Sequence, residues 1–216
     1  MKNVLKTTTL CLFILLGLSC NTSKKEKKEA DAKDAKIVMD GPYHSVDTTG
    51  ASLKWTAYKF TDKVGVHGTF DDFKLDMEKV SESREDFLEG DKITIHTQSV
   101  NSGNVIRDDK LRTYFFTVFH TDTIKAEILN ANNGVGKMSL ELNNITREID
   151  YDYVQNGDTL FLNAAIDLIH WKGEEALNIL NQECYELHMG ADRVSKLWPN
   201  VDITMKLPMD LIKVSK

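Results

Sequence analysis

Histidines and paired carboxylates are the side chains of this sequence that could bind a metal or catalyse hydrolysis. The six histidines are His44, His67, His96, His120, His170 and His188, and no two of them form a His-x-x-x-His pair. The carboxylate pairs are Asp71-Asp72, Asp108-Asp109 and Glu174-Glu175, and adjacent residues on a strand point to opposite faces. A zinc site assembled from distant strands stays open, but no spacing favours it. We therefore predict no metal and no cofactor.

Motifs of nucleotide-binding and nucleophilic enzymes are also absent from the sequence. It contains no Gly-rich phosphate loop, no Gly-x-Ser-x-Gly and no Cys-x-x-Cys. Without a nucleophile and its base, we do not expect an enzyme. Cys184 lies in Asn-Gln-Glu-Cys-Tyr-Glu, and we interpret it as a small buried hydrophobe rather than a reactive thiol.

Aromatic residues carry a stronger signal, because many of them fall on predicted strands or at strand ends. In the run Tyr114-Phe115-Phe116-Thr117-Val118-Phe119 both faces of an extended segment would be apolar, so both must be covered. One face would line a barrel interior and the other would meet a helix or lid. The pattern fits a filled core, and it equally fits a barrel left hollow for a ligand, which about eight strands can just provide.

The N-terminus has the features of an export signal that ends at a cysteine. Lys2 and Lys6 precede the apolar run Leu10–Leu18, which is too short for the about 20 residues that span a bilayer. Ser19 then precedes Cys20, as in a bacterial lipobox, although Gly17 stands where an apolar residue is usual. We predict a signal peptide over residues 1–19 and a lipid anchor on Cys20. Cleavage by an ordinary signal peptidase near Ser19 is the alternative.

Residues 20–36 predict a charged tether, because they contain six Lys and four acids and no apolar side chain larger than Ala after Cys20. Residues 37–216 then form one domain with 19 basic and 29 acidic residues, a balance of −10. So acidic a domain argues against nucleic acid as a partner and against electrostatic docking on an anionic membrane. We expect a location in the bacterial cell envelope, exported and lipid-anchored, at the periplasmic or outer-membrane face.

Alternation of apolar and polar residues predicts a mostly β domain. It is clear at residues 53–58, 93–96, 137–143 and 201–207, and further strands are predicted at 64–73, 121–130, 148–154, 160–168 and 186–194. Asn156-Gly157-Asp158 marks a hairpin turn. Short helices are predicted at 81–88, 104–113 and 173–182, each positioned to cover an edge or open end. The fold class is an antiparallel sandwich or barrel.

Several motifs resemble the YceI-like family, over nearly the whole domain from about Tyr43 to about Lys206. The most specific are Ser99-Val100-Asn101-Ser102-Gly103-Asn104, then Arg107-Asp108-Asp109-Lys110-Leu111-Arg112, then Tyr114-Phe115-Phe116. Val64–Phe73 and Gly136–Leu140 are similar to two of the family's strands. Asn143-Asn144-Ile145-Thr146 departs from the family's usual His-Gly-Val-Thr, and residues 170–185 look like an added helix.

The resemblance implies an antiparallel lipocalin-like β-barrel of about eight strands with two or three short covering helices. It implies a long-chain, isoprenoid-like lipid as the ligand, held inside the barrel for storage, transport or stress protection. The expected ligand-binding residues are Trp55, Phe70, Phe73, Arg107, Leu111, Phe115, Phe116 and Phe119.

Two questions stay open at the level of sequence. Arg107 with Asp108 is interpreted first as an ion pair that locks a helix onto the barrel, and second as a contact to a lipid headgroup. The domain itself is interpreted first as a lipid-binding protein, and second as a structural or protein-interaction domain with a filled core. A homodimer also stays open.

Overall fold

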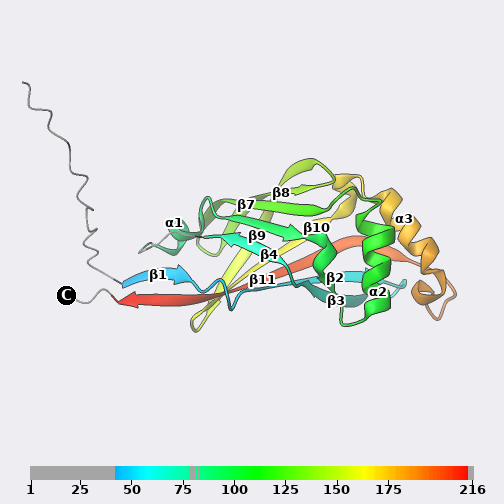
Figure 1. The fold of residues 1–216 in the computed structure, drawn as a ribbon, viewed down its shortest axis with the longest axis horizontal. Coiled ribbons are helices and arrows are strands. Elements are labelled where there is room, and N and C mark those ends of the chain that lie inside the picture. Colours follow the sequence, from blue (N-terminus) through cyan, green and yellow to red (C-terminus); the bar gives the residue numbers. More distant parts are fainter. Residues whose placement is uncertain (1–41, 78–80, 82, 214–216) are drawn as a thin grey trace, which may run out of the picture. The chain divides into compact units, whose positions relative to one another are not determined.

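The computed structural model describes residues 42–77, 81 and 83–213, which belong to a compact unit, Met39–Lys216. The predicted signal peptide 1–19, Cys20 and the predicted tether 20–36 lie outside the described residues. None of the described helices combines the length and the apolar character needed to cross a membrane. Figure 1 shows the arrangement of the elements.

Eleven strands alternate with short helices along the described chain. The strands are β1 (Pro42–Val46), β2 (Ser52–Lys59), β3 (Val64–Phe70), β4 (Phe73–Asp76), β5 (Lys92–His96), β6 (Val100–Asn101), β7 (Thr123–Asn132), β8 (Val135–Leu142), β9 (Ile145–Asn156), β10 (Thr159–Asp167) and β11 (Leu197–Lys213). The helices are α1 (Arg84–Leu88), η1 (Thr97–Ser99), α2 (Val105–Lys110), η2 (Leu111–Phe116), η3 (Leu168–Trp171), α3 (Glu174–Glu183) and η4 (Tyr185–His188).

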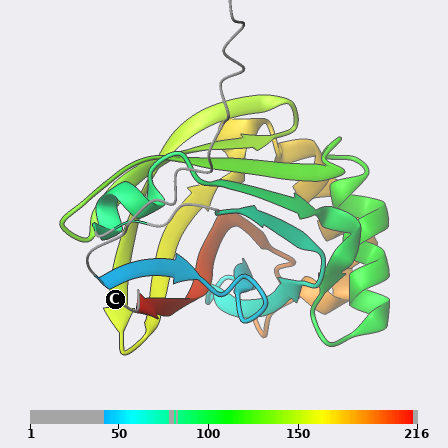
Figure 2. The same cartoon turned by 60° about the vertical axis from the view of Figure 1, so that its left-hand side comes forward.

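One antiparallel sheet takes the order β4-β5-β7-β8-β9-β10-β11-β2-β3-β6, with β1 paired to β11 outside this path. The two ends of this order are joined by the chain, because β3 runs into β4 and β5 runs through η1 into β6. Taking each of these pairs as one bent strand, eight strands form a ring. Figure 2 shows the sheet curling around its interior. The predicted barrel of about eight strands is confirmed.

Backbone hydrogen bonds continue the ring of strands through the bend between β3 and β4. Phe70 pairs with Val100 on one side of the bend, and Phe73 pairs with Ile95 on the other. Between them, Asp71 N donates to Ser99 O at 3.1 Å and His96 N donates to Asp72 O at 3.0 Å. The single strand predicted over 64–73 is therefore bent at Asp71-Asp72, and the ladder continues around the corner.

The run Tyr114–Phe119 is not extended, which corrects the interpretation of it as a two-faced strand. Leu111–Phe116 forms a π-helix that continues α2, with Thr117 N bonded to Arg112 O at 3.1 Å. Phe115, Phe116 and Phe119 all point to the buried side of this helical segment. Adjacent apolar residues look two-sided in a strand, whereas a helical segment places them on one broad face.

The predicted strand over 186–194 is also wrong, because η4 and a tight loop occupy it. This loop belongs to a segment after β10 that covers one end of the barrel (Figure 1). Trp171 is fully buried there and its Nε1 donates to Leu140 O at 3.3 Å. His188 Nδ1 lies 3.1 Å from Asn181 Oδ1, which links η4 to α3. The helix predicted at 173–182 matches α3.

The barrel wall requires glycine at position 68. A Cβ there would lie 2.5 Å from both the Trp55 ring and Asn101 O. We expect Gly68→Ala to lower the free energy of unfolding by about 1–3 kcal/mol, as overpacking does. Gly65→Ala on the same strand is the control, because its Cβ would meet the Thr56 methyl at 3.1 Å and the Tyr58 ring at an ordinary 3.7 Å. Denaturant unfolding measures both, and equal stability of Gly68→Ala and the unaltered protein would contradict the packing.

The free energy of unfolding should depend on pH through His188 of η4. Burial, with lesser effects of Lys59 and Lys110, lowers the pKa of His188 from 6.5 to about 4. The unfolded chain therefore takes up this proton first as the pH falls, so unfolding free energy should decline between pH 6.5 and about 4. His188→Gln, which retains an amide to bond Asn181, should flatten this decline. An unchanged pH profile of unfolding in the variant would exclude His188 as its source.

Candidate functional site

An apolar cavity of about 170 Å³ lies inside the barrel. Its wall combines residues of β2, β3, β5 to β11, η2, η3 and α3. The inward positions follow the strand alternation: Leu162, Ala164 and Ile166 line the cavity from β10, and Ile203 and Met205 line it from β11. Every second residue of these strands is apolar, so the fold itself builds the wall.

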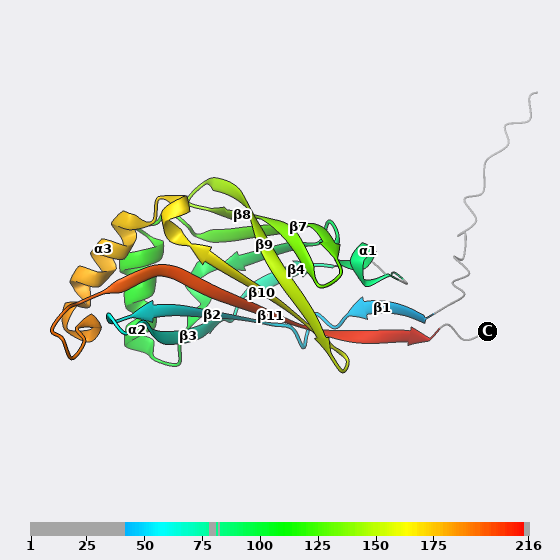
Figure 3. The same ribbon diagram turned by 180° about the vertical axis from the view of Figure 1, so that it is seen from behind.

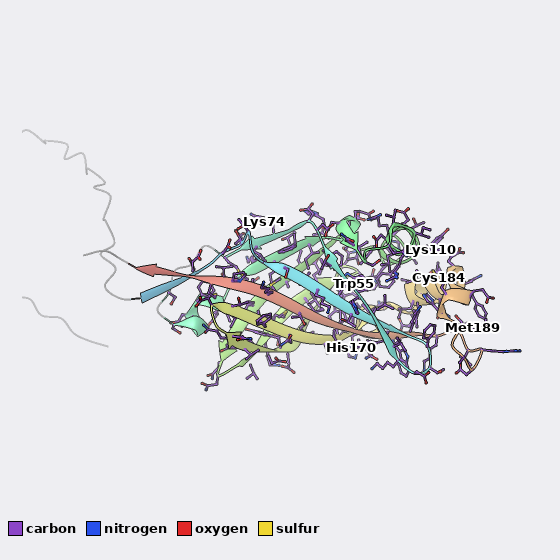
Figure 4. All side chains as sticks on the ribbon, turned by 90° about the horizontal axis from the view of Figure 1, so that it is seen from below. Trp55, Lys74, Lys110, His170, Cys184 and Met189 are labelled. Carbon is purple, nitrogen blue, oxygen red and sulfur yellow. The ribbon has the colours of Figure 1, made fainter. Side chains whose placement is uncertain are left out.

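Six of the eight expected ligand-binding residues line this cavity. They are Trp55, Phe70, Leu111, Phe115, Phe116 and Phe119. Figure 4 shows Trp55 in the middle part of the barrel. Phe73 and Arg107 do not line it. Phe73 lies beyond the bend after β3 and packs against the core, whereas Arg107 is exposed on α2.

Four phenylalanines form one connected aromatic group at the cavity wall. The rings of Phe115 and Phe116 meet edge to face, with centroids 5.1 Å apart. Phe70 of β3 approaches Phe116 at 6.0 Å and Phe119 approaches Phe115 at 5.3 Å. Such pairs add about 0.5–1.5 kcal/mol each beyond the area they bury. The π-helix, with Phe70 and Phe119 beside it, therefore presents an aromatic face to the cavity.

The α2–η2 segment is held by Asp108 and Arg112, which corrects the predicted Arg107–Asp108 lock. Asp108 is buried and its Oδ1 accepts bonds from Ser102 N at 2.8 Å and Ser102 Oγ at 2.6 Å. Arg112 pairs with Asp109 and donates to Gln98 O at 2.8 Å and Val100 O at 3.0 Å. Neighbouring residues on a helix point about 100° apart, so Arg107 faces solvent while Asp108 faces the barrel.

Polar atoms of the lining residues are bonded away from the cavity. Trp55 Nε1 donates to Thr69 O at 3.2 Å, and Trp198 Nε1 donates to Phe60 O at 2.7 Å. The Tyr58 hydroxyl donates to Asp202, and the Asn163 amide donates to Asp152 at 2.9 Å. The interior thus offers hydrocarbon contacts and little hydrogen bonding. Such a surface can hold an apolar chain, and it has no group placed to move a proton.

Cys184 and Lys110 lie close together at the end covered by helices, as Figure 4 shows. Cys184 is a buried free cysteine, and its burial raises the pKa of the thiol. Lys110 Nζ donates to Glu183 O at 2.9 Å, so the lysine joins α2 to the end of α3. A protonated, buried thiol is a packing residue here. Among the residues that the structure describes, no group of three metal-ligating side chains gathers.

The aliphatic residues of the cavity wall were not among the ligand-binding residues expected from the sequence. The missed residues include Ile93, Ile124, Leu140, Leu162, Leu177 and Leu180. Their alternation or helical spacing marked them as core, but core and cavity wall have the same signature in sequence. Only the arrangement in space distinguishes them.

The comparisons with known proteins agree with this architecture. The YceI-like domain family matches residues 44–209. A solved polyisoprenoid binding domain from Saccharophagus degradans, implicated in plant cell wall breakdown, is 14% identical with a TM-score of 0.56, covering 78% of this chain and 98% of that one. BcnA of Burkholderia cenocepacia is 15% identical with a TM-score of 0.51, covering 76% of this chain and 99% of that one. No curated protein matches the sequence.

The family match spans most of the chain and coincides with the closed ring of strands from β2 to β11. It also includes the Ser102–Asp108 contact and the phenylalanines that follow it. This chain therefore belongs to the YceI-like domain family.

Proposed function

We propose that this protein binds the hydrocarbon tail of a long-chain amphiphile, isoprenoid-like, in the barrel interior. The observation that carries the proposal is the cavity of about 170 Å³ with its almost wholly apolar wall. Each buried tail methylene contributes about 0.8 kcal/mol before the costs of binding, so affinity needs no catalytic group. The similarity in fold to a polyisoprenoid binding domain supports the choice of ligand class.

The size of the cavity limits how much of a ligand it holds. It is comparable to an engineered apolar cavity of about 150 Å³ that binds benzene. In this conformation it takes a short stretch of a tail. A longer tail requires the lining side chains to move apart, or part of the ligand to remain outside.

The proposed setting is the cell envelope, with the domain anchored through a lipid on Cys20 and a charged tether over residues 20–36. Storage, transport and stress protection are the roles that such an anchored binding protein would serve. A filled-core structural domain is the second candidate, and the unfilled interior weighs against it.

Native mass spectrometry of the protein purified from its own host tests the proposal. We expect a fraction of the protein to carry an added mass of lipid size, released by organic solvent and identified after extraction. Protein that is free of lipid, and that also fails to bind an added fluorescent fatty acid such as cis-parinaric acid, would contradict it.

Filling the cavity should weaken ligand binding without unfolding the protein. Ala126 of β7 and Ala57 of β2 line the cavity from different strands. We expect Ala126→Leu, and separately Ala57→Leu, to weaken cis-parinaric acid binding by about ten-fold or more, because the added side chain occupies the space for the tail. Ala191→Leu, at an exposed loop position, is the matched control. Undiminished binding by both filled variants, with melting temperatures near that of the unaltered protein, would place the ligand elsewhere.

A further inference from the structure

The barrel wall is not continuous between β9 and β10. β9 pairs with β8 along residues 145–152 but with β10 only along residues 151–156. The β9–β10 ladder ends at Tyr151 and Ala164, while residues 165–167 of β10 continue their pairing with β11. We call the stretch between residues 145–150 and 165–167 the β9–β10 seam. Figure 3 shows the two strands diverging from their common hairpin.

Both flanks of the seam contribute to the cavity. Ile149 lines it from β9, and Ile166 and Leu168 line it from the β10 side. Ile149 lies opposite Met138 in the β8–β9 register, on the face that points inward. It is nevertheless only half-buried, and Ile145 is half-buried as well, whereas Leu140 and Leu142 on the neighbouring strand are buried. The inward face of β9 is therefore only partly covered beside the seam.

Arg147 occupies an inward register position of this same strand. It lies directly opposite Leu140, which lines the cavity, and cross-strand partners share a face. In a continuous wall this position would bury a guanidinium among hydrocarbon, which is costly. The Arg147 side chain is instead exposed, and its Nε donates to His170 O at 2.6 Å, across the wide end of the seam. Because the β9–β10 ladder ends before Arg147, its guanidinium reaches solvent and the cost of burying a charge is avoided.

The acidic groups beside the seam are already engaged or face outward. Asp150 forms an ion pair with Lys137 at 2.8 Å, and Asp167 Oδ1 accepts a bond from Ile169 N at 3.0 Å. Glu148 takes the outward register, opposite Ser139. None of the ion pairs formed by the described residues involves Arg147. Its guanidinium is thus available to an anion from outside the chain.

We propose that the β9–β10 seam is a side entrance to the cavity, and that Arg147 at its lip holds the anionic headgroup of an amphiphile, a phosphate or a carboxylate. The tail passes between the strands and reaches the space behind Ile149 and Ile166. A cavity of about 170 Å³ cannot enclose a whole long-chain lipid, so a side entrance lets the headgroup and part of the tail stay outside. This inference rests on the proposed function.

A disulfide across the seam tests the entrance. Asp150 and Ala165 would form the next rung after Tyr151–Ala164, and both line one open pocket of the wall. Asp150→Cys with Ala165→Cys should close the base of the seam on oxidation. We expect the oxidised form to load and release cis-parinaric acid at least five-fold more slowly than its own reduced form, measured by stopped-flow fluorescence.

The matched control is Asp150→Cys with Lys137→Cys, since these two residues already face each other in the β8–β9 ladder. It removes the same Lys137–Asp150 ion pair but staples a part of the wall that is already closed. Its oxidation should leave the rates unchanged. If the seam cysteines do not form a disulfide, a short bis-maleimide linker joins them. Unchanged rates in the stapled seam variant would overturn the entrance.

Arg147 is tested by two ligands with the same tail, farnesyl phosphate and the neutral farnesol. We expect Arg147→Ala to weaken farnesyl phosphate by about ten-fold, from the loss of charged hydrogen bonds, and to change farnesol less than two-fold. Arg147→Lys, which retains the charge, should recover most of the loss. Lys125→Ala is the charge control, because Lys125 is exposed on β7 and paired with Glu141.

The outcomes distinguish headgroup binding by Arg147 from tail binding in the cavity. An equal effect of Arg147→Ala on both ligands would overturn the headgroup role while leaving tail binding intact. If the unaltered protein binds neither farnesyl compound nor cis-parinaric acid, the proposed function itself fails. Binding of inorganic phosphate as tightly as farnesyl phosphate would show an anion site that does not depend on a tail, and would contradict the proposed amphiphile.

Discussion

The closure of the sheet at the bend between β3 and β4 is the constraint on which the rest of the structure depends. Without the pairing of β3 with β6 and of β4 with β5, and the bonds from Asp71 N to Ser99 O and from His96 N to Asp72 O between them, the sheet would have two free edges and no enclosed interior. The same corner positions the helical segment, because Arg112 donates to the carbonyl oxygens of Gln98 and Val100. The helical segment with the phenylalanines of the cavity wall is therefore anchored at the same corner where the ring closes.

The apolar interior and the β9–β10 seam have opposite physical characters. Where the ladders are complete, inward residues such as Leu140 and Leu207 are apolar and buried. Where β9 leaves β10, the inward register carries Arg147 and half-buried isoleucines. The proposed ligand, with an apolar tail and an anionic head, would match an apolar cavity beside a stretch where β9 and β10 are unpaired and Arg147 is exposed. The proposed ligand class therefore follows from the apolar wall and from the position of Arg147.

Much of the fold was predictable because strand alternation and turn chemistry are local signals. Most of the strands, the Asn156-Gly157-Asp158 turn and α3 follow from them, and the motifs around Arg107 and Phe115 indicated the family. Local signals failed at Tyr114–Phe119, where two-sided apolar character arises equally from a strand and from a π-helix. They also failed to place Arg107, because it is exposed while its neighbour on the helix, Asp108, is buried. The seam at Arg147 depends on where two strands separate, which no local pattern records.

The central claim is that an apolar chain occupies the interior of this barrel. The most direct measurement is a crystal structure of the protein with a long-chain fatty acid brominated near its tail end, using the anomalous signal of bromine. The account predicts a bromine peak inside the cavity, among Phe116, Leu162 and Met205. A bromine peak only on the outer surface, with the interior unchanged and empty, would contradict it.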